Sequence, residues 1–229
     1  MISPEPVLND QTQIDFFERH VARLLISLYY CGQPVQSLLE GEIRQVDVLS
    51  RLQQFDFWVR EPGHLALALM RSFSSTPDRL DEAKPSLRSF FERMIENDQA
   101  DIRRVTLPYT HNPLEDLDAS LSWLTARALV SDRPSFAKSR QFSHQVVLET
   151  PGVAFVRKIL ESCPAFGWYR DQAEVVTAYF TRLEHFDLTV MSYLSPELNP
   201  AVAVTAPLVP FIRRRYETQF PPLDRPPAG

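Results

Sequence analysis

The sequence of 229 residues predicts a mainly α-helical protein with small β-wings, and two observations carry that prediction. Apolar residues recur at spacings of three and four through most of the chain, which is the period of an amphipathic helix. Residues 142–149 instead alternate in polarity, as a half-buried strand does. The order within residues 112–163 is therefore a helix, two strands around a basic loop, and a helix. That order is typical of a winged helix, a domain type that binds macromolecules and rarely catalyses.

The helix that opens this unit has a marked start. Asn112 is a favourable N-cap residue, Pro113 suits the first helical position, and Glu115 stands three residues after the cap, as in a capping box. The leucines that define its apolar face are Leu114, Leu117, Leu121 and Leu124. We therefore expect one amphipathic helix from Pro113 onwards.

Two short strands and a second helix complete the unit. Residues 128–130 are apolar and predict the first strand, whereas residues 133–140 are basic and rich in turn-forming residues. Residues 142–148 predict the second strand, and Thr150-Pro151 marks the start of the next helix. The basic stretch is thus expected to form the wing.

The first half of the chain shows three helical patterns. We expect helices over residues 10–30, 43–59 and 65–73, with a turn and a short helical piece around residues 35–39 between the first two. Three helices suit a second, degenerate winged helix, although no wing is legible in this half. The sequence therefore predicts winged-helix domains in tandem.

Polar and proline-rich stretches divide the chain. Residues 74–85 predict a linker, and residues 102–107 predict a short strand. Further helices are expected over residues 86–97, 169–186 and 188–194. The predicted organisation is an N-terminal helical domain at residues 1–75, a winged-helix domain with C-terminal helices at residues 86–195, and a Pro-rich tail at residues 196–229.

The composition is that of an ordinary globular protein. Hydrophobic residues make up 44% of the chain and charged residues 23%, so the chain can bury a core. A formal net charge of −5 disfavours a protein held on nucleic acid by charge alone, although a local basic patch stays open. The sequence lacks a run as long as a membrane span and the pattern of a signal peptide. We therefore expect a cytoplasmic protein without membrane contact, with Cys31 and Cys163 reduced.

The sequence shows no group of residues arranged for catalysis. Glycine-rich nucleotide-binding patterns are missing, and none of the five histidines stands at metal-ligand spacing from another histidine or a cysteine. The close carboxylates Asp98 and Asp101 are explained by the end of a helix and a polar turn. We therefore predict that the chain is not an enzyme and has no catalytic residue, cofactor or metal. An enzyme of unfamiliar type stays open as a third hypothesis.

The predicted wing and helix carry opposite charges. Candidate DNA contacts in the wing are Arg133, Lys138 and Arg140, which would reach phosphates, although a solvated hairpin tip explains them as well. The presumptive recognition helix starts with acids instead, namely Glu115, Asp116 and Asp118. Phosphates would repel carboxylates at this position, and acids in a first turn also suit the helix dipole. We therefore take the acidic face as a candidate partner-binding surface.

The Pro-rich tail holds the densest basic run of the chain, flanked by apolar and aromatic residues. These further candidate partner-binding residues are Phe211, Ile212, Arg213, Arg214, Arg215 and Tyr216. Such a composition suits a segment that folds onto a protein surface. Phosphate contact by the arginines and packing of the tail on its own domain are the alternatives.

Three stretches resemble the phrases of a known family. The stretch from Gly41 to Pro62 resembles a helix that ends in an LDFLLRYP-like phrase. Residues 121–130 resemble a phrase that reads LvarGLV, with Ala128 in place of the glycine, and Thr150-Pro151-Gly152 resembles a TexG helix start. In this order the phrases are similar to the small middle components of bacterial three-component ABC-type systems, which include the Lamassu anti-phage and anti-plasmid systems.

The resemblance spans residues 14–195 and implies a non-enzymatic accessory subunit with tandem winged helices. In such systems the middle component works beside an SMC-like ATPase and an effector nuclease, which carry out ATP hydrolysis and cleavage. We therefore expect an adaptor that docks on an SMC-like ATPase in an antiviral defence complex, with direct DNA contact left open. The alternative is a winged-helix DNA-binding transcriptional regulator that uses the basic wing.

Overall fold

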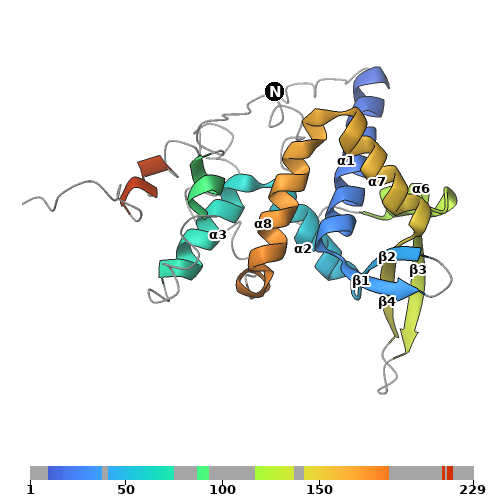
Figure 1. Cartoon of the computed structure of the whole chain (residues 1–229). Coiled ribbons are helices and arrows are strands. Elements are labelled where there is room, and N and C mark those ends of the chain that lie inside the picture. Colours follow the sequence, from blue (N-terminus) through green and yellow to red (C-terminus); the bar gives the residue numbers. More distant parts are fainter. Residues whose placement is uncertain are drawn as a thin grey trace, which may run out of the picture. The chain divides into compact units, whose positions relative to one another are not determined.

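The structure is a computed structural model that describes residues 10–37, 41–74, 87–92, 117–136, 142–185, 213–214 and 216–218 (Figure 1). Within these residues the chain is mainly helical and carries one small antiparallel sheet. The elements run in the order α1 (Asp10–Cys31), β1 (Gln33–Ser37), β2 (Gly41–Val46), α2 (Leu49–Arg60), α3 (Pro62–Ser74), α6 (Asp118–Ala126), β3 (Val130–Phe136), β4 (Phe142–Leu148), α7 (Thr150–Ser162), a 3-10 turn (Pro164–Phe166) and α8 (Gly167–Leu183). None of the helices in these ranges is long and apolar enough to cross a membrane.

The sheet joins two hairpins through their second strands. Its strand order is β1-β2-β4-β3, and every pairing is antiparallel. The hairpins meet where Val46 of β2 lies opposite Val146 of β4. Each outer strand contains a proline, Pro34 in β1 and Pro134 in β3. Because proline has no backbone N–H to offer a further strand, these edges resist the addition of another chain.

The two hairpins share one pairing register. Pro34 pairs with Arg44 in the first hairpin, and Pro134 pairs with His144 in the second. Both residues of the second pair have numbers one hundred higher than those of the first. The two valines that face each other where β2 meets β4 differ by the same number. A helix also precedes and follows each hairpin. The strand order and the residue pairing are therefore the same on the two sides of the valine pair.

Two sequence predictions for the first half are wrong. The short helical piece expected around residues 35–39 is strand as far as Ser37, and the helix expected at residues 43–59 begins only at Leu49, after strand β2. Ile43 and Val46 are both buried, and their spacing of three residues imitates a helical stripe. This imitation hides the first hairpin from a reading of periodicity.

The hairpin of the second half is confirmed, with changed boundaries. Strand β4 covers the predicted residues, whereas β3 continues to Phe136 and takes in Arg133 and Pro134, which were expected in the turn. Proline fits there because β3 is an edge strand. The described part of the expected helix is α6, which begins at Asp118 directly after the N-cap residue Leu117. The expected capping box at residues 112–115 lies outside the described residues.

Most other helix predictions are confirmed. Helices α1, α3, α7 and α8 match the expected segments within a few residues, and residues 87–92 are helical within the segment expected at 86–97. The linker beyond Ser74, the strand expected at residues 102–107, the helix expected at 188–194 and the tail up to residue 212 lie outside the described residues.

The chain separates into two compact units, each made of two stretches. Unit 1 combines Met1–Asp56 with Asp116–Glu174, and unit 2 combines Phe57–Glu115 with Val175–Gly229. The division falls inside α2 and α8. Since both hairpins belong to one sheet, the predicted ranges 1–75 and 86–195 both contribute residues to unit 1.

Unit 1 is built around the sheet. Helix α1 packs against β2, β4 and α7, while α6 packs against β3 (Figure 1). A buried ion pair ties α1 to α2, because Arg23 Nε lies 2.8 Å from Asp56 Oδ1 and both side chains are almost wholly excluded from solvent. Arg23 also contacts the ring of His20 at 3.0 Å. Removing one partner of such a pair typically costs about 3–5 kcal/mol.

Unit 2 has an aromatic core. Its largest buried side chains include Phe57, Trp58, Phe73, Phe90 and Phe91. The ring of His64 meets that of Phe57 edge-on, with 5.4 Å between the ring centroids, and the histidine is 4% exposed. Burial, and next the charge of Arg60, lower the pKa of His64 to about 4. The imidazole is therefore neutral at neutral pH.

Two positions that the resembled phrases give as glycine, Ala128 and Gly152 in this chain, have a local backbone that favours glycine. Ala128 has a φ of 53°, in the left-handed region that glycine adopts without a Cβ penalty. A Cβ on Gly152 would collide with the carbonyl oxygen of Leu129 and with the side chain of Leu148. The start of α7 therefore packs against the α6–β3 connection as only glycine allows.

We predict that Ala128→Gly stabilises the protein by about 1 kcal/mol, because it relieves the left-handed strain of an alanine. Denaturant unfolding measures the change. Ala119→Gly is the matched control, since this exposed residue lies inside α6, where glycine costs about 1 kcal/mol. Equal destabilisation by both variants would contradict the strain at Ala128.

We predict that stability falls as the pH drops from 6.5 to 4. The unfolded His64 binds a proton near its ordinary pKa of 6.5, whereas the folded one does so only near 4, so acidification favours the unfolded state. The loss attributable to this group approaches about 3 kcal/mol. Urea unfolding at a series of pH values, compared with His64→Leu, measures it. Parallel pH profiles of the two proteins would contradict the assignment.

Candidate protein-binding surface

The basic residue of the predicted wing that the structure describes makes contacts within its own chain. Arg133 Nη2 lies 2.7 Å from Glu149 Oε1, and its Nε donates to Ser131 Oγ at 3.2 Å. The side chain of Arg133 is 42% exposed. Lys138 and Arg140 lie outside the described residues. Arg133 is therefore placed on the surface of β3 with a carboxylate partner beside it.

A histidine and an aspartate form a second side-chain pair on the same hairpin. His144 Nδ1 is 3.0 Å from Asp132 Oδ2, and both side chains are more than half exposed. An acid thus stands beside the wing arginine in sequence and faces outward. The described part of the hairpin presents mixed charges rather than a row of cations.

Of the three candidate acids, the structure describes one. Asp118 is exposed and lies in the first turn of α6, the position that the helix dipole favours for a carboxylate. Glu115 and Asp116 lie outside the described residues. The structure thus agrees with the dipole interpretation of Asp118 and leaves its role toward a partner as a proposal.

Tyr216 of the tail packs on the unit to which it belongs. The ring of Tyr216 lies 5.2 Å from that of Phe91, and the raised pKa of the Tyr216 hydroxyl reflects burial first and the charge of Glu92 second. Arg213 and Arg214 are helical and exposed. Phe211, Ile212 and Arg215 lie outside the described residues. Packing of the tail on its own domain, which the sequence left as an alternative, therefore holds for Tyr216.

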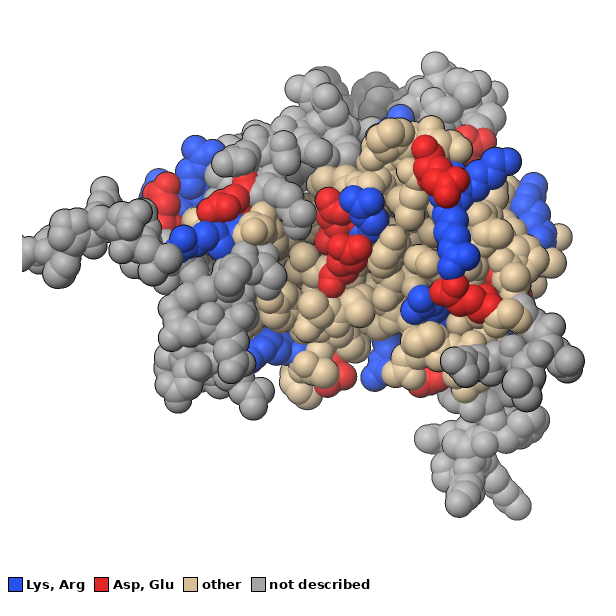
Figure 2. Space-filling view, viewed as in Figure 1, with Lys and Arg blue, Asp and Glu red and all other residues tan. Residues whose placement is uncertain are grey.

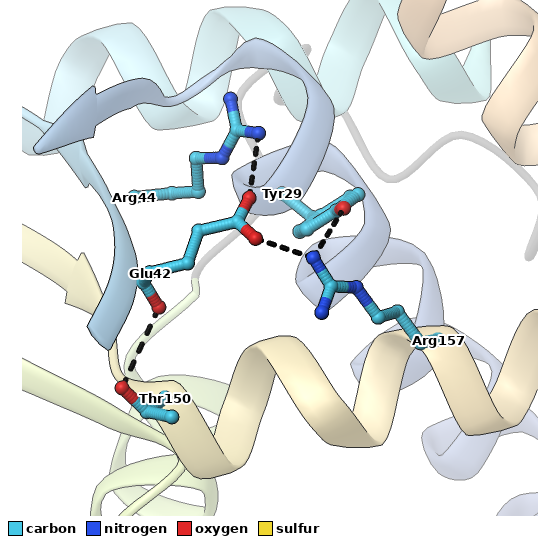
Figure 3. A network of polar contacts seen from close by, with 5 residues as sticks. All are labelled: Tyr29, Glu42, Arg44, Thr150 and Arg157. Atoms are coloured by element: carbon cyan, nitrogen blue, oxygen red, sulfur yellow. Dashed lines mark hydrogen bonds and ion pairs between the residues drawn. The ribbon is translucent and has the colours of Figure 1, made fainter. Parts of the chain in front are cut away.

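Figure 3 shows a polar network that the sequence did not reveal. The carboxylate of Glu42 in β2 pairs with two arginines, one at each oxygen. Arg44 Nη2 lies 2.8 Å from Oε1, and Arg157 of α7 pairs with Oε2. Arg157 Nη2 also donates to the hydroxyl of Tyr29 at 3.5 Å. The hydroxyl of Thr150 donates to the Glu42 carbonyl oxygen at 3.5 Å. The network therefore ties α1, β2 and α7 together at the surface of unit 1.

The network contains two arginines and one carboxylate, so its charges do not balance. The hydrogen bond from Arg44 is the largest cause that holds the pKa of Glu42 below its ordinary value; burial acts against it, and the charges of Arg157 and Arg44 lower the pKa further. Tyr29 and Glu42 in turn raise the pKa of Arg157. Because a guanidinium stays charged in proteins, the two arginines exceed the one carboxylate of Glu42 by a single positive charge.

The periodicity of the sequence does not indicate this network, because its residues follow the spacing of a strand. Glu42 and Arg44 stand two residues apart, which places them on the same face of a strand but on different faces of a helix. Their segment was expected to be helical or turn, so the alternation carried no weight. A glutamate and an arginine at strand spacing were the available signal.

Charges of both signs are interleaved over the visible face of the described residues, as Figure 2 shows. Several of the arginines lie beside a carboxylate, as in the pairs formed by Arg133, Arg157 and Arg170. Among the described residues, no three histidine, cysteine, aspartate or glutamate side chains come together as a metal site requires. The described face therefore presents positive and negative side chains next to each other.

Comparisons with family models, with curated proteins and with solved structures found no match to this chain.

We predict that Glu42→Gln lowers the free energy of unfolding by less than about 1 kcal/mol, because partly exposed ion pairs stabilise weakly. The difference shrinks at high salt and as the pH falls below 4.5 through the lowered pKa of folded Glu42. Denaturant unfolding at two salt concentrations measures it. Glu161→Gln, at an exposed position of α7, is the control, and an equal effect there would contradict a specific role for Glu42.

Proposed function

We propose that the chain is a non-catalytic adaptor that docks on an SMC-like ATPase within an anti-phage or anti-plasmid defence complex. The observation that carries the proposal is the pairing of surface arginines with carboxylates in unit 1, as in the network around Glu42. Phosphates demand a surplus of cations, whereas a protein surface of mixed charge complements a mixed one. Binding to a protein partner therefore fits these residues better than binding to DNA by charge.

Two backbone positions in this chain are compatible with the glycines of the resembled phrases. The two glycines of the resembled phrases fall at Ala128, which has a left-handed backbone, and at Gly152, which has no room for a Cβ. Both positions belong to the junction of α6, β3 and α7. Glycine is thus the residue that this chain's backbone favours at both positions, and we take this as support for an accessory subunit of the three-component systems.

The shared register of the two hairpins supports the tandem organisation. Each half of the chain contributes a helix, a hairpin and a further helix, and the hairpins pair equivalently. We infer that the halves are two degenerate winged helices joined through β2 and β4. In this account ATP hydrolysis belongs to the ATPase and cleavage to the effector nuclease, and the adaptor supplies contacts to them.

The test is co-expression of the full chain with an SMC-like ATPase encoded by a neighbouring gene, followed by affinity capture and size-exclusion chromatography. We expect one complex that elutes earlier than either protein alone. The proposal fails if both proteins are folded and elute separately.

A DNA-binding regulator is the second candidate. The pairing of Phe136 with Phe142 makes the basic Lys138 and Arg140 part of the segment that connects β3 to β4, where a wing would contact phosphates. This candidate predicts duplex binding that weakens steeply with salt and is lost when Arg133, Lys138 and Arg140 are all changed to alanine. Fluorescence anisotropy with a labelled duplex decides the matter, since an adaptor without DNA contact gives no such dependence.

A further inference from the structure

Two tyrosines near the end of α1 form the centre of a surface patch in unit 1. The rings of Tyr29 and Tyr30 meet edge-on, with 5.0 Å between their centroids, and both side chains are partly exposed. Tyrosine supplies a large, rigid contact area with a polar tip, which is why it is enriched where proteins meet. We call the tyrosines and the two charged groups beside them the tyrosine patch.

The group on the Tyr29 side is basic. The guanidinium carbons of Arg44 and Arg157 lie 5.1 Å and 6.0 Å from the centroid of the Tyr29 ring. Both arginines share Glu42, as Figure 3 shows, so one positive charge remains in excess. The side chain of Arg157 is 54% exposed. Its guanidinium therefore has donors available to a carboxylate from outside.

The group on the Tyr30 side is acidic. Arg170, Asp171 and Glu174 lie on the first turns of α8, and Arg170 pairs with Asp171 at 2.7 Å. Glu174 is exposed and leaves one negative charge in excess. Burial first, and then the charge of Glu174, raise the pKa of Tyr30, in keeping with a carboxylate close to that ring.

The two charged groups are separate on the surface. Figure 2 shows one cluster of charges over α8 and another over α7 and β2, with uncharged surface between them where α1 runs in Figure 1. The tyrosine patch therefore has a basic group with one excess positive charge, two aromatic rings, and an acidic group with one excess negative charge.

We propose that the tyrosine patch binds a second copy of this chain. A two-fold axis through the tyrosine pair would set the basic group of each copy against the acidic group of the other, and the rings against the rings. Such an isologous contact needs a surface that complements itself, and this patch does because its two ends carry equal and opposite excess charge. This contact does not depend on the proposed role beside an ATPase.

The first experiment is sedimentation equilibrium of the full chain, whose monomer mass is 26.4 kDa, over a range of concentrations. We expect the average mass to rise toward twice that value with concentration, and the association to weaken with salt, because paired charges are screened. A mass that stays monomeric up to about 100-fold above the starting concentration would overturn the proposal.

Charge reversal locates the contact. Arg157→Glu makes both ends acidic, and Glu174→Arg makes both ends basic, so each variant alone repels its own copy. We expect each to raise the dissociation constant of the dimer about tenfold or more. Mixed in equal amounts, the two variants regain complementary ends, and we expect a heterodimer close in affinity to the unmodified protein.

Control variants outside the patch and a check of folding separate loss of the contact from a general effect of charge or misfolding. Lys158→Glu and Glu161→Arg make the same charge changes at exposed positions of α7 outside the patch, and we expect both to dimerise normally. Circular dichroism confirms that each variant is folded; if Arg157→Glu is not, Glu174→Arg alone decides, and unchanged dimerisation by it would overturn the proposal. A chain that stays monomeric while Arg157→Glu weakens its ATPase complex would also overturn it and assign the patch to the heterologous partner.

Discussion

The pairing of β2 with β4 is the contact on which the rest of unit 1 depends. It is short, running from Arg44 opposite Leu148 to Val46 opposite Val146, yet it unites two hairpins that lie one hundred residues apart. A two-stranded hairpin alone is marginally stable, whereas four strands covered by helices can bury a common core. Helix α1 rests on both β2 and β4, and α7 rests on β2 and α1, so helices of each half pack against strands of the other.

The sequence predicted most of the helices and the second hairpin, because their apolar spacing matches one period along the whole segment. It failed at the first hairpin, where Ile43 and Val46 are buried at a spacing that belongs to a helix. The same failure concealed the network around Glu42, since strand faces cannot be assigned inside an assumed helix. Contacts between residues far apart in the sequence, such as the ion pair of Arg23 with Asp56, leave no periodic signal in the sequence, because they depend on tertiary packing.

Charge placement links the fold to the proposed role. Arg133, which the sequence presents as a phosphate contact, lies beside the carboxylate of Glu149, and Arg157 of α7 lies beside that of Glu42. These pairs contribute little stability, but they set the pattern of excess charge that a partner meets. A surface with this charge pattern suits selection among protein partners, as the proposed adaptor role requires. The contribution of each charged residue to partner binding can be tested by substitution.

Native-state hydrogen exchange of the backbone amides tests the central claim, that the two hairpins form one cooperative sheet, most directly. The account predicts that protected amides of β2 and β4 exchange with the same free energy of opening, because neither strand can open without the other. Free energies that differ between the two hairpins, with one exchanging while the other stays protected, would contradict the claim.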